Sequence, residues 1–152
     1  MKVRSFAIIV AAALSGPAAP AFATTQEQSA VLAPVRAMFD GMAKYDQDAM
    51  RATVQPEGSV ALLRKGKVVR MTLGDFIDRI KPGKDRIEER IHDPLVRIDG
   101  DLAMVWTPYE FLVDGQVKHC GTDLVHLVKM DGRWLIAGIA DNSRDECPAA
   151  KP

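Results

Sequence analysis

Three Asp-Gly dipeptides divide the second half of the chain into long runs of β-branched, aromatic and aliphatic residues. They are Asp99-Gly100, Asp114-Gly115 and Asp131-Gly132. A two-residue type I′ hairpin turn requires a positive φ at both central positions, and Asp-Gly adopts that conformation readily. The pattern therefore predicts four consecutive antiparallel strands, over about 87–98, 101–113, 116–130 and 133–142.

The first half of the chain predicts helices and one hairpin. Apolar residues recur at helical spacing over one stripe, which comprises Val31, Val35, Met38, Phe39 and Met42. Asp46 predicts the N-cap of a short helix over 46–53, and Thr72 that of a third helix over 73–80. The alternating segment 58–71 turns at a glycine and predicts a hairpin between these two helices.

Helices followed by a long meander predict an α+β fold, with helices on one face of a curved antiparallel sheet. The 152 residues are enough for one such domain. Both faces of the predicted strands are largely apolar, whereas a sheet with one face in water would alternate polar and apolar residues. We therefore expect the helices to cover one face and a second copy of the chain to cover the other, as a homodimer.

The N-terminus has the pattern of a secretory signal peptide. Lys2 and Arg4 precede an uninterrupted apolar run over 6–14, and Ala21 and Ala23 provide the small residues of a cleavage site. The alternative is a membrane anchor, but this run is far shorter than the roughly 20 residues that span a bilayer. We expect residues 1–23 to be removed, and residues 24–152 to form one periplasmic or secreted domain without membrane attachment.

Composition and motifs exclude several classes of function. The formal net charge of zero argues against nucleic acid or an anionic membrane as the main partner. The sequence has no Gly-rich phosphate loop, no Gly-x-Ser-x-Gly and no His-Glu-x-x-His. Its two cysteines have no further metal ligands at useful spacing, so neither a metal nor another cofactor is expected.

Two-residue turns fix which residues face each other across the meander. The count places Trp106 opposite Asp123 and Glu110 opposite His119, all on one face. Asp123 is the first catalytic candidate, because a carboxyl group desolvated beside a large aromatic side chain gains a raised pKa suited to a general base. The alternative is a structural carboxylate at the junction of sheet and helix.

His119 is the second catalytic candidate, oriented by Glu110 across the hairpin. The alternative is a solvated ion pair near the turn. His119 and Asp123 lie about 13 Å apart along their strand, which is too far for a direct hydrogen bond.

The two cysteines are expected to meet. The same count places Cys120 opposite Ser143, and Cys147 follows four residues later, close enough for the tail to fold back. An oxidising compartment would favour a Cys120–Cys147 disulfide. Two free thiols are the alternative.

Four segments of the chain resemble the nuclear transport factor 2-like superfamily: FDGM in the first helix, HDPLVRIDGDLAMVWTPYEF, HCGTDLVHLVK and DGRWLIAGIAD. The resemblance covers most of residues 30–147. More narrowly, these segments resemble exported bacterial members described as SnoaL-like or putative lumazine-binding. It implies a cone-shaped fold with a central pocket, often dimeric through the outer sheet face. Its relatives include isomerases, dehydratases, hydrolases, binding proteins and assembly modules, so it implies no single reaction.

The expected pocket combines the helix stripe with the meander, and its candidate lining residues are Phe39, Met42, Trp106, Tyr109, His119 and Asp123. Ketosteroid isomerases of this superfamily place a tyrosine among carboxylates inside the cone. The predicted register instead directs Tyr109 to the face opposite Asp123, where packing is the alternative role.

Three functions remain open. The first is binding of a small apolar molecule. The second is a cofactor-free isomerase, dehydratase or hydrolase with Asp123 as base. The third is a dimeric interaction module with a vestigial pocket.

Overall fold

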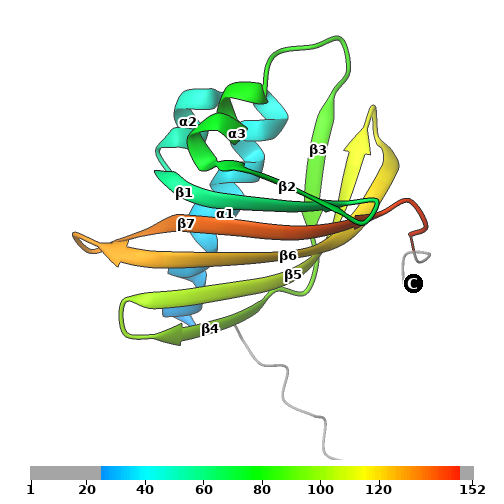
Figure 1. The fold of residues 1–152 in the computed structure, drawn as a ribbon. Helices are drawn as coiled ribbons and strands as arrows, with labels where there is room; N and C mark the ends of the chain where they lie inside the picture. The colour runs from blue at the N-terminus through cyan, green and yellow to red at the C-terminus, as the bar shows by residue number, and fades with distance from the viewer. Residues whose placement is uncertain (1–24, 148–152) are drawn as a thin grey trace, which may run out of the picture.

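The computed structural model describes residues 25–147, a seven-stranded sheet with helices packed on one face (Figure 1). The predicted signal peptide, with cleavage after Ala23, lies outside the described residues. No helix within residues 25–147 has the length and apolarity needed to cross a membrane.

All three predicted helices are confirmed, because their capping signals were local. Helix α1 (Gln26–Lys44) begins at a Thr25 capping box and buries the predicted apolar stripe. Helix α2 (Gln47–Arg51) is capped by Asp46, and helix α3 (Leu73–Arg79) by Thr72. Helix α1 packs on the concave face of the sheet. Its apolar stripe joins buried residues of α2, α3 and the strands in the core.

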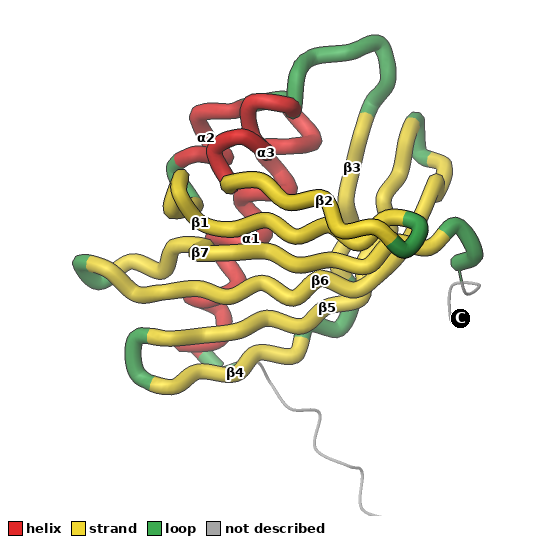
Figure 2. Tube along the Cα trace, viewed as in Figure 1, coloured by secondary structure: helices red, strands yellow, loops and turns green. Residues whose placement is uncertain are grey.

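The strands are β1 (Val54–Arg64), β2 (Lys67–Thr72), β3 (Ile87–Ile91), β4 (Leu95–Asp99), β5 (Leu102–Val113), β6 (Gln116–Met130) and β7 (Arg133–Arg144). Their order is β2-β1-β7-β6-β5-β3, with β4 also paired to β5. The sheet bends strongly, so that β3 and the adjoining ends of β5 and β6 rise at a steep angle to the rest (Figure 2).

Two features of the predicted sheet are wrong. The sheet is mixed rather than antiparallel, because β1 joins β7 in parallel. Hairpin turns determine pairing only between strands adjacent in sequence, and β1 meets β7 through tertiary packing. The predicted strand 87–98 is also divided, since Asp93 takes a positive φ of 42° before Pro94. Its two halves pair with opposite ends of β5.

The predicted turns are present, with one difference. Asp114-Gly115 and Asp131-Gly132 have positive φ at both positions, as a type I′ turn requires. In the first hairpin Asp99 ends β4, and only Gly100 has a positive φ. That turn therefore consists of Gly100 and Asp101, with glycine at its first position.

Two irregularities change the register. One lies between Phe111 and Leu112 in the β5–β6 pairing, and the other between His126 and Leu127 in the β6–β7 pairing. Beyond each, partners shift by one residue, and a one-residue shift moves side chains to the other face. Asp123 consequently faces Thr107 and Asp141, not Trp106 and Ala140.

Candidate functional site

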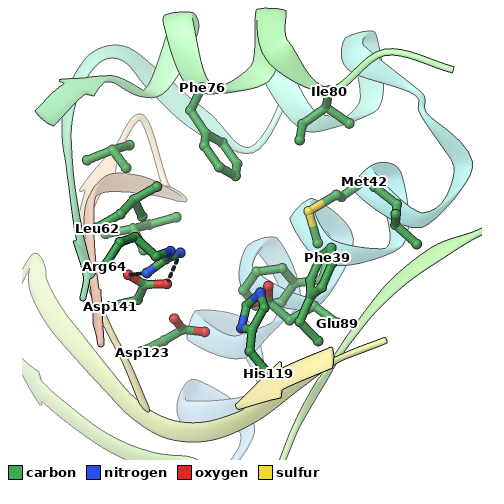
Figure 3. Close-up of a pocket in the computed structure, with 14 residues that line it drawn as sticks. Phe39, Met42, Leu62, Arg64, Phe76, Ile80, Glu89, His119, Asp123 and Asp141 are labelled. Carbon is green, nitrogen blue, oxygen red and sulfur yellow. Dashed lines mark hydrogen bonds and ion pairs between the residues drawn. The ribbon is translucent and has the colours of Figure 1, made fainter. Parts of the chain in front are cut away.

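A pocket of about 220 Å³ lies between α1, α3 and the concave face of the sheet (Figure 3). Its apolar lining comprises Phe39, Met42, Val60, Leu62, Phe76, Ile80, Ile87, Phe111 and Ile139. Its polar lining comprises Arg64, Glu89, His119, Asp123 and Asp141. The site is thus an apolar chamber with charged groups concentrated on one wall.

Strand periodicity places these polar groups together. Asp123 on β6 and Asp141 on β7 are directly opposed, so two carboxylates adjoin on the inner face. Glu89 on β3 belongs to the row of Phe111 and His119, which is separated from the Asp123 row on the inner face by the row of Tyr109 and Gly121. Like charges directly opposed across strands destabilise a sheet unless they are neutralised. The surrounding side chains supply that neutralisation in two ways.

The first is an ion pair. Arg64 donates two hydrogen bonds to Asp141, at 2.5 Å and 2.6 Å, from the end of β1. The Tyr109 hydroxyl donates to the same carboxylate at 3.1 Å and also lies 3.4 Å from His119 Nδ1. Burial and the neighbouring Asp141 and Glu89 carboxylates raise the pKa of Tyr109, so its hydroxyl stays protonated and remains a donor. Asp141 is thereby held as a charged, fully engaged group.

The second is protonation. Asp123 is only 2% exposed, and its Oδ2 has no hydrogen-bond partner among the described residues. Burial raises the pKa of Asp123 to about 7, opposed by hydrogen bonding to Glu89 and reinforced by the charge of Asp141. Burial and then the charge of Asp123 raise the pKa of Glu89 well above its ordinary value. At neutral pH this pair therefore holds at least one proton that it could give to or share with a ligand.

His119 lies between two aromatic rings. It stacks on Phe111, with ring centroids 4.8 Å apart, and meets Tyr109 edge-on at 5.8 Å. Burial and the positive charge of Arg64 lower the pKa of His119, so the ring is neutral at neutral pH. A neutral imidazole in this position lines the pocket with one hydrogen-bond donor and one hydrogen-bond acceptor.

Four of the six predicted pocket residues, Phe39, Met42, His119 and Asp123, line the pocket. Trp106 does not: it lies on the outer face opposite Leu124 and is 47% exposed. The prediction failed because the irregularity near the β5–β6 turn shifts every pairing beyond it by one residue.

The same shift corrects the expectations for Tyr109 and Glu110. Tyr109 points inward, on the face of Asp123, and its ring fills the space above Gly121, where a Cβ would lie 2.6 Å from the ring. Glu110 points outward and contacts His92 at 3.3 Å instead of His119. His119 and Asp123 remain without a direct hydrogen bond, and the Tyr109 hydroxyl contacts both His119 and Asp141, the cross-strand partner of Asp123.

Sequence reasoning missed Arg64, Glu89 and Asp141. Each lies two residues from apolar side chains that point into the pocket, namely Leu62, Ile87 and Ile139. Because side chains alternate along a strand, a charge at that spacing shares their inward direction. This signal was available, but the distant segments could not be assembled without the β1–β7 pairing.

The predicted disulfide is confirmed. Cys120 and Cys147 are bonded, with Cα atoms 5.7 Å apart. The register shift places Cys120 opposite Arg144 rather than Ser143. The bond holds the segment after β7 against β6, one residue from His119. Among residues 25–147, no three His, Cys, Asp or Glu side chains are grouped as a metal site would require.

Solved structures share this fold. A nuclear transport factor 2-like protein of unknown function from Shewanella baltica is 18% identical, with a TM-score of 0.63 over 80% of this chain and 96% of its own. One from Cytophaga hutchinsonii is 14% identical, with a TM-score of 0.66 over 79% and 100%. A putative calcium/calmodulin-dependent protein kinase II association domain from Xanthomonas campestris is 18% identical, with a TM-score of 0.65 over 85% and 95%.

A comparison with curated protein sequences finds no significant match. The sequence family described as putative lumazine-binding matches residues 26–138, which span α1 to the middle of β7. The match includes four of the five polar residues of the pocket. The chain therefore belongs to the putative lumazine-binding family, on a nuclear transport factor 2-like fold.

Proposed function

We propose that this protein is an exported binding protein for a small, mainly apolar molecule held between α1, α3 and the concave sheet. The observation that carries the proposal is the pocket of about 220 Å³, whose walls are mostly aliphatic and aromatic. Ligand sites commonly combine such walls with a few placed polar groups. A hollow of this kind favours the binding of a small molecule. A protein-interaction module does not need such a hollow and could have a filled core.

The polar wall defines what the ligand must offer. Asp123 Oδ2 is buried without a hydrogen-bond partner among residues 25–147, and leaving a buried polar atom unpaired costs free energy. A ligand hydroxyl, ring N–H or carbonyl could satisfy the partly protonated Asp123–Glu89 pair. A flat heterocycle such as a lumazine carries such groups on an aromatic body, which agrees with the description of the family.

The binding proposal can be tested with the neutral fluorescent probe N-phenyl-1-naphthylamine. Leu62→Trp would fill the pocket, and we expect it to weaken binding at least tenfold. Leu63→Trp is the matched control, because Leu63 is the next residue, is 44% exposed and does not line the pocket. Equal binding of the probe by both variants would contradict the proposal. In the wild-type protein, lumazine can be titrated in competition with the bound probe.

Proton transfer by Asp123 is the second candidate function, favoured by its pKa of about 7 and its free oxygen. A general acid or base works best when its pKa lies near the operating pH. Carboxyl carbon NMR of the labelled protein would measure this titration directly, with Asp123→Asn assigning the signal. A midpoint near the ordinary value of 3.8 would remove Asp123 from consideration as a base.

We propose export on the pattern of residues 1–23, supported by the Cys120–Cys147 disulfide, since such bonds persist mainly in oxidising compartments. Expression of the whole chain in a bacterial host tests this by mass spectrometry of the periplasmic fraction. The expected mass begins at Thr24 and is two hydrogens below the reduced mass. An intact N-terminus in the cytoplasm would contradict it.

We also propose a homodimer through the outer sheet face. One register row there is entirely apolar across five strands: Leu95, Trp106, Leu124, Ala140 and Ala61. Light scattering should report twice the chain mass, and Trp106→Glu should halve it. A monomer at micromolar concentration would contradict this proposal.

A further inference from the structure

A second hollow, of about 580 Å³, adjoins the pocket at the turn between β1 and β2. Arg64 and His119 line both hollows, so the two meet at these side chains. The outer hollow adds Lys65, Lys67 and Arg144, which with Arg64 form what we call the basic rim. The pocket therefore opens toward four cations.

The charges of the basic rim are poorly compensated. Arg64 is paired with Asp141, but no ion pair within residues 25–147 involves Lys65, Lys67 or Arg144. Arg64 and Lys67 are direct cross-strand partners, an arrangement in which like charges repel. Asp145 is the carboxylate among the residues that line the outer hollow. An anion placed there would relieve this repulsion.

The fold positions the basic rim firmly. Lys65 and Gly66 form a tight turn with φ of 50° and 75°, which places Lys67 beside Arg64. Arg144 ends β7 opposite Cys120, and the disulfide to Cys147 closes the chain just beyond it. These cations belong to strand ends and a short turn, not to a long loop.

We propose that the ligand is an amphiphilic anion, with its apolar body in the pocket and a carboxylate or phosphate group at the basic rim. This inference rests on the proposed binding function and adds the ligand's charge and orientation. The anionic group cannot lie deeper, because Asp123, Glu89 and Asp141 already bring acidic groups together there. The ligand would extend from the basic rim past His119, which lines both hollows, to Asp123 on the inner wall of the pocket.

Isothermal titration calorimetry of the purified protein with decanoate and with 1-decanol distinguishes the contribution of the ligand's apolar chain from that of its negative charge. We expect decanoate to bind at least about tenfold more tightly than decanol, and the double variant Lys65→Gln/Lys67→Gln to remove that difference. Decanol binding should be unchanged in that variant, which also shows that the pocket is folded. The control Arg36→Gln/Lys44→Gln makes the same charge change on exposed positions of α1 and should behave as wild type.

A gain of affinity gives an independent test. Asp145→Asn removes the carboxylate at the outer hollow and should tighten decanoate binding severalfold without affecting decanol. If both molecules bind equally, the proposed function stands and the anion inference fails. If decanoate is preferred but the basic-rim variant keeps the preference, the inference also fails. If neither binds, the proposed function fails and the inference fails with it.

Discussion

Replacing Asp123 by asparagine should make the protein more stable at neutral pH and change how stability depends on pH. The carboxyl has a pKa of about 7 in the folded protein, against an ordinary value of 3.8 that applies when the chain is unfolded. Below pH 3.8 both states hold the proton, so the group makes no difference. As the pH rises toward 7 the unfolded state loses its proton first, and the folded state becomes progressively less stable relative to it.

The magnitude follows from the two pKa values. Each pKa unit corresponds to about 1.36 kcal/mol, so the full loss by pH 8 is about 4 kcal/mol at most. Asparagine is neutral at every pH and has nearly the same shape, so the variant avoids this loss. Glu89 shares the effect, because its own pKa is raised partly by the charge of Asp123. We therefore expect the free energy of unfolding of Asp123→Asn, relative to that of wild type, to rise by about 2–4 kcal/mol as the pH increases from 4 to 8.

Urea denaturation at pH 4, 5, 6, 7 and 8 measures this difference. Asp131→Asn serves as the control, because Asp131 is exposed in a turn with a positive φ that asparagine tolerates. A difference between Asp123→Asn and wild type that stays constant from pH 4 to pH 8 would refute the reasoning. Asp123 would then be an ordinary ionised carboxylate with compensating partners.

Three further predictions concern stability. Arg64→Met should leave Asp141 without its ion-pair partner and lower the free energy of unfolding by about 1–2 kcal/mol, since Arg64 is partly exposed; no loss in urea denaturation would mean that solvent replaces the pair. Reduction of the disulfide, which closes a loop of 27 residues, should cost about 3 kcal/mol, and an equal melting temperature with and without reductant would contradict this. Gly121→Ala should cost more than 2 kcal/mol, because its Cβ would lie 1.8 Å from a backbone oxygen, whereas Gly83→Ala has room and should be neutral by the same assay.

Features that depend on neighbouring residues could be predicted from the sequence. The α1 stripe, the Asp46 and Thr72 caps and two of the Asp-Gly turns occur where the local pattern indicated. Each rests on interactions between residues a few positions apart, which other parts of the chain hardly alter. The α+β class followed from the order of these elements, and four of the residues expected around a pocket, Phe39, Met42, His119 and Asp123, line the hollow between α1, α3 and the sheet.

The remainder of the site depends on long-range geometry. One irregular position near the β5–β6 turn sends Trp106 outward and Tyr109 inward, because a single extra residue reverses the faces of a strand. The pairing of β1 with β7 brings Arg64 to Asp141, 77 residues away in the sequence. The sequence by itself determined the helices, most of the strands, the order of these elements and the proximity of the two cysteines near one strand end. Only the tertiary structure decided which charges share the pocket, because strand register and the proximity of distant segments are set by packing of the whole chain.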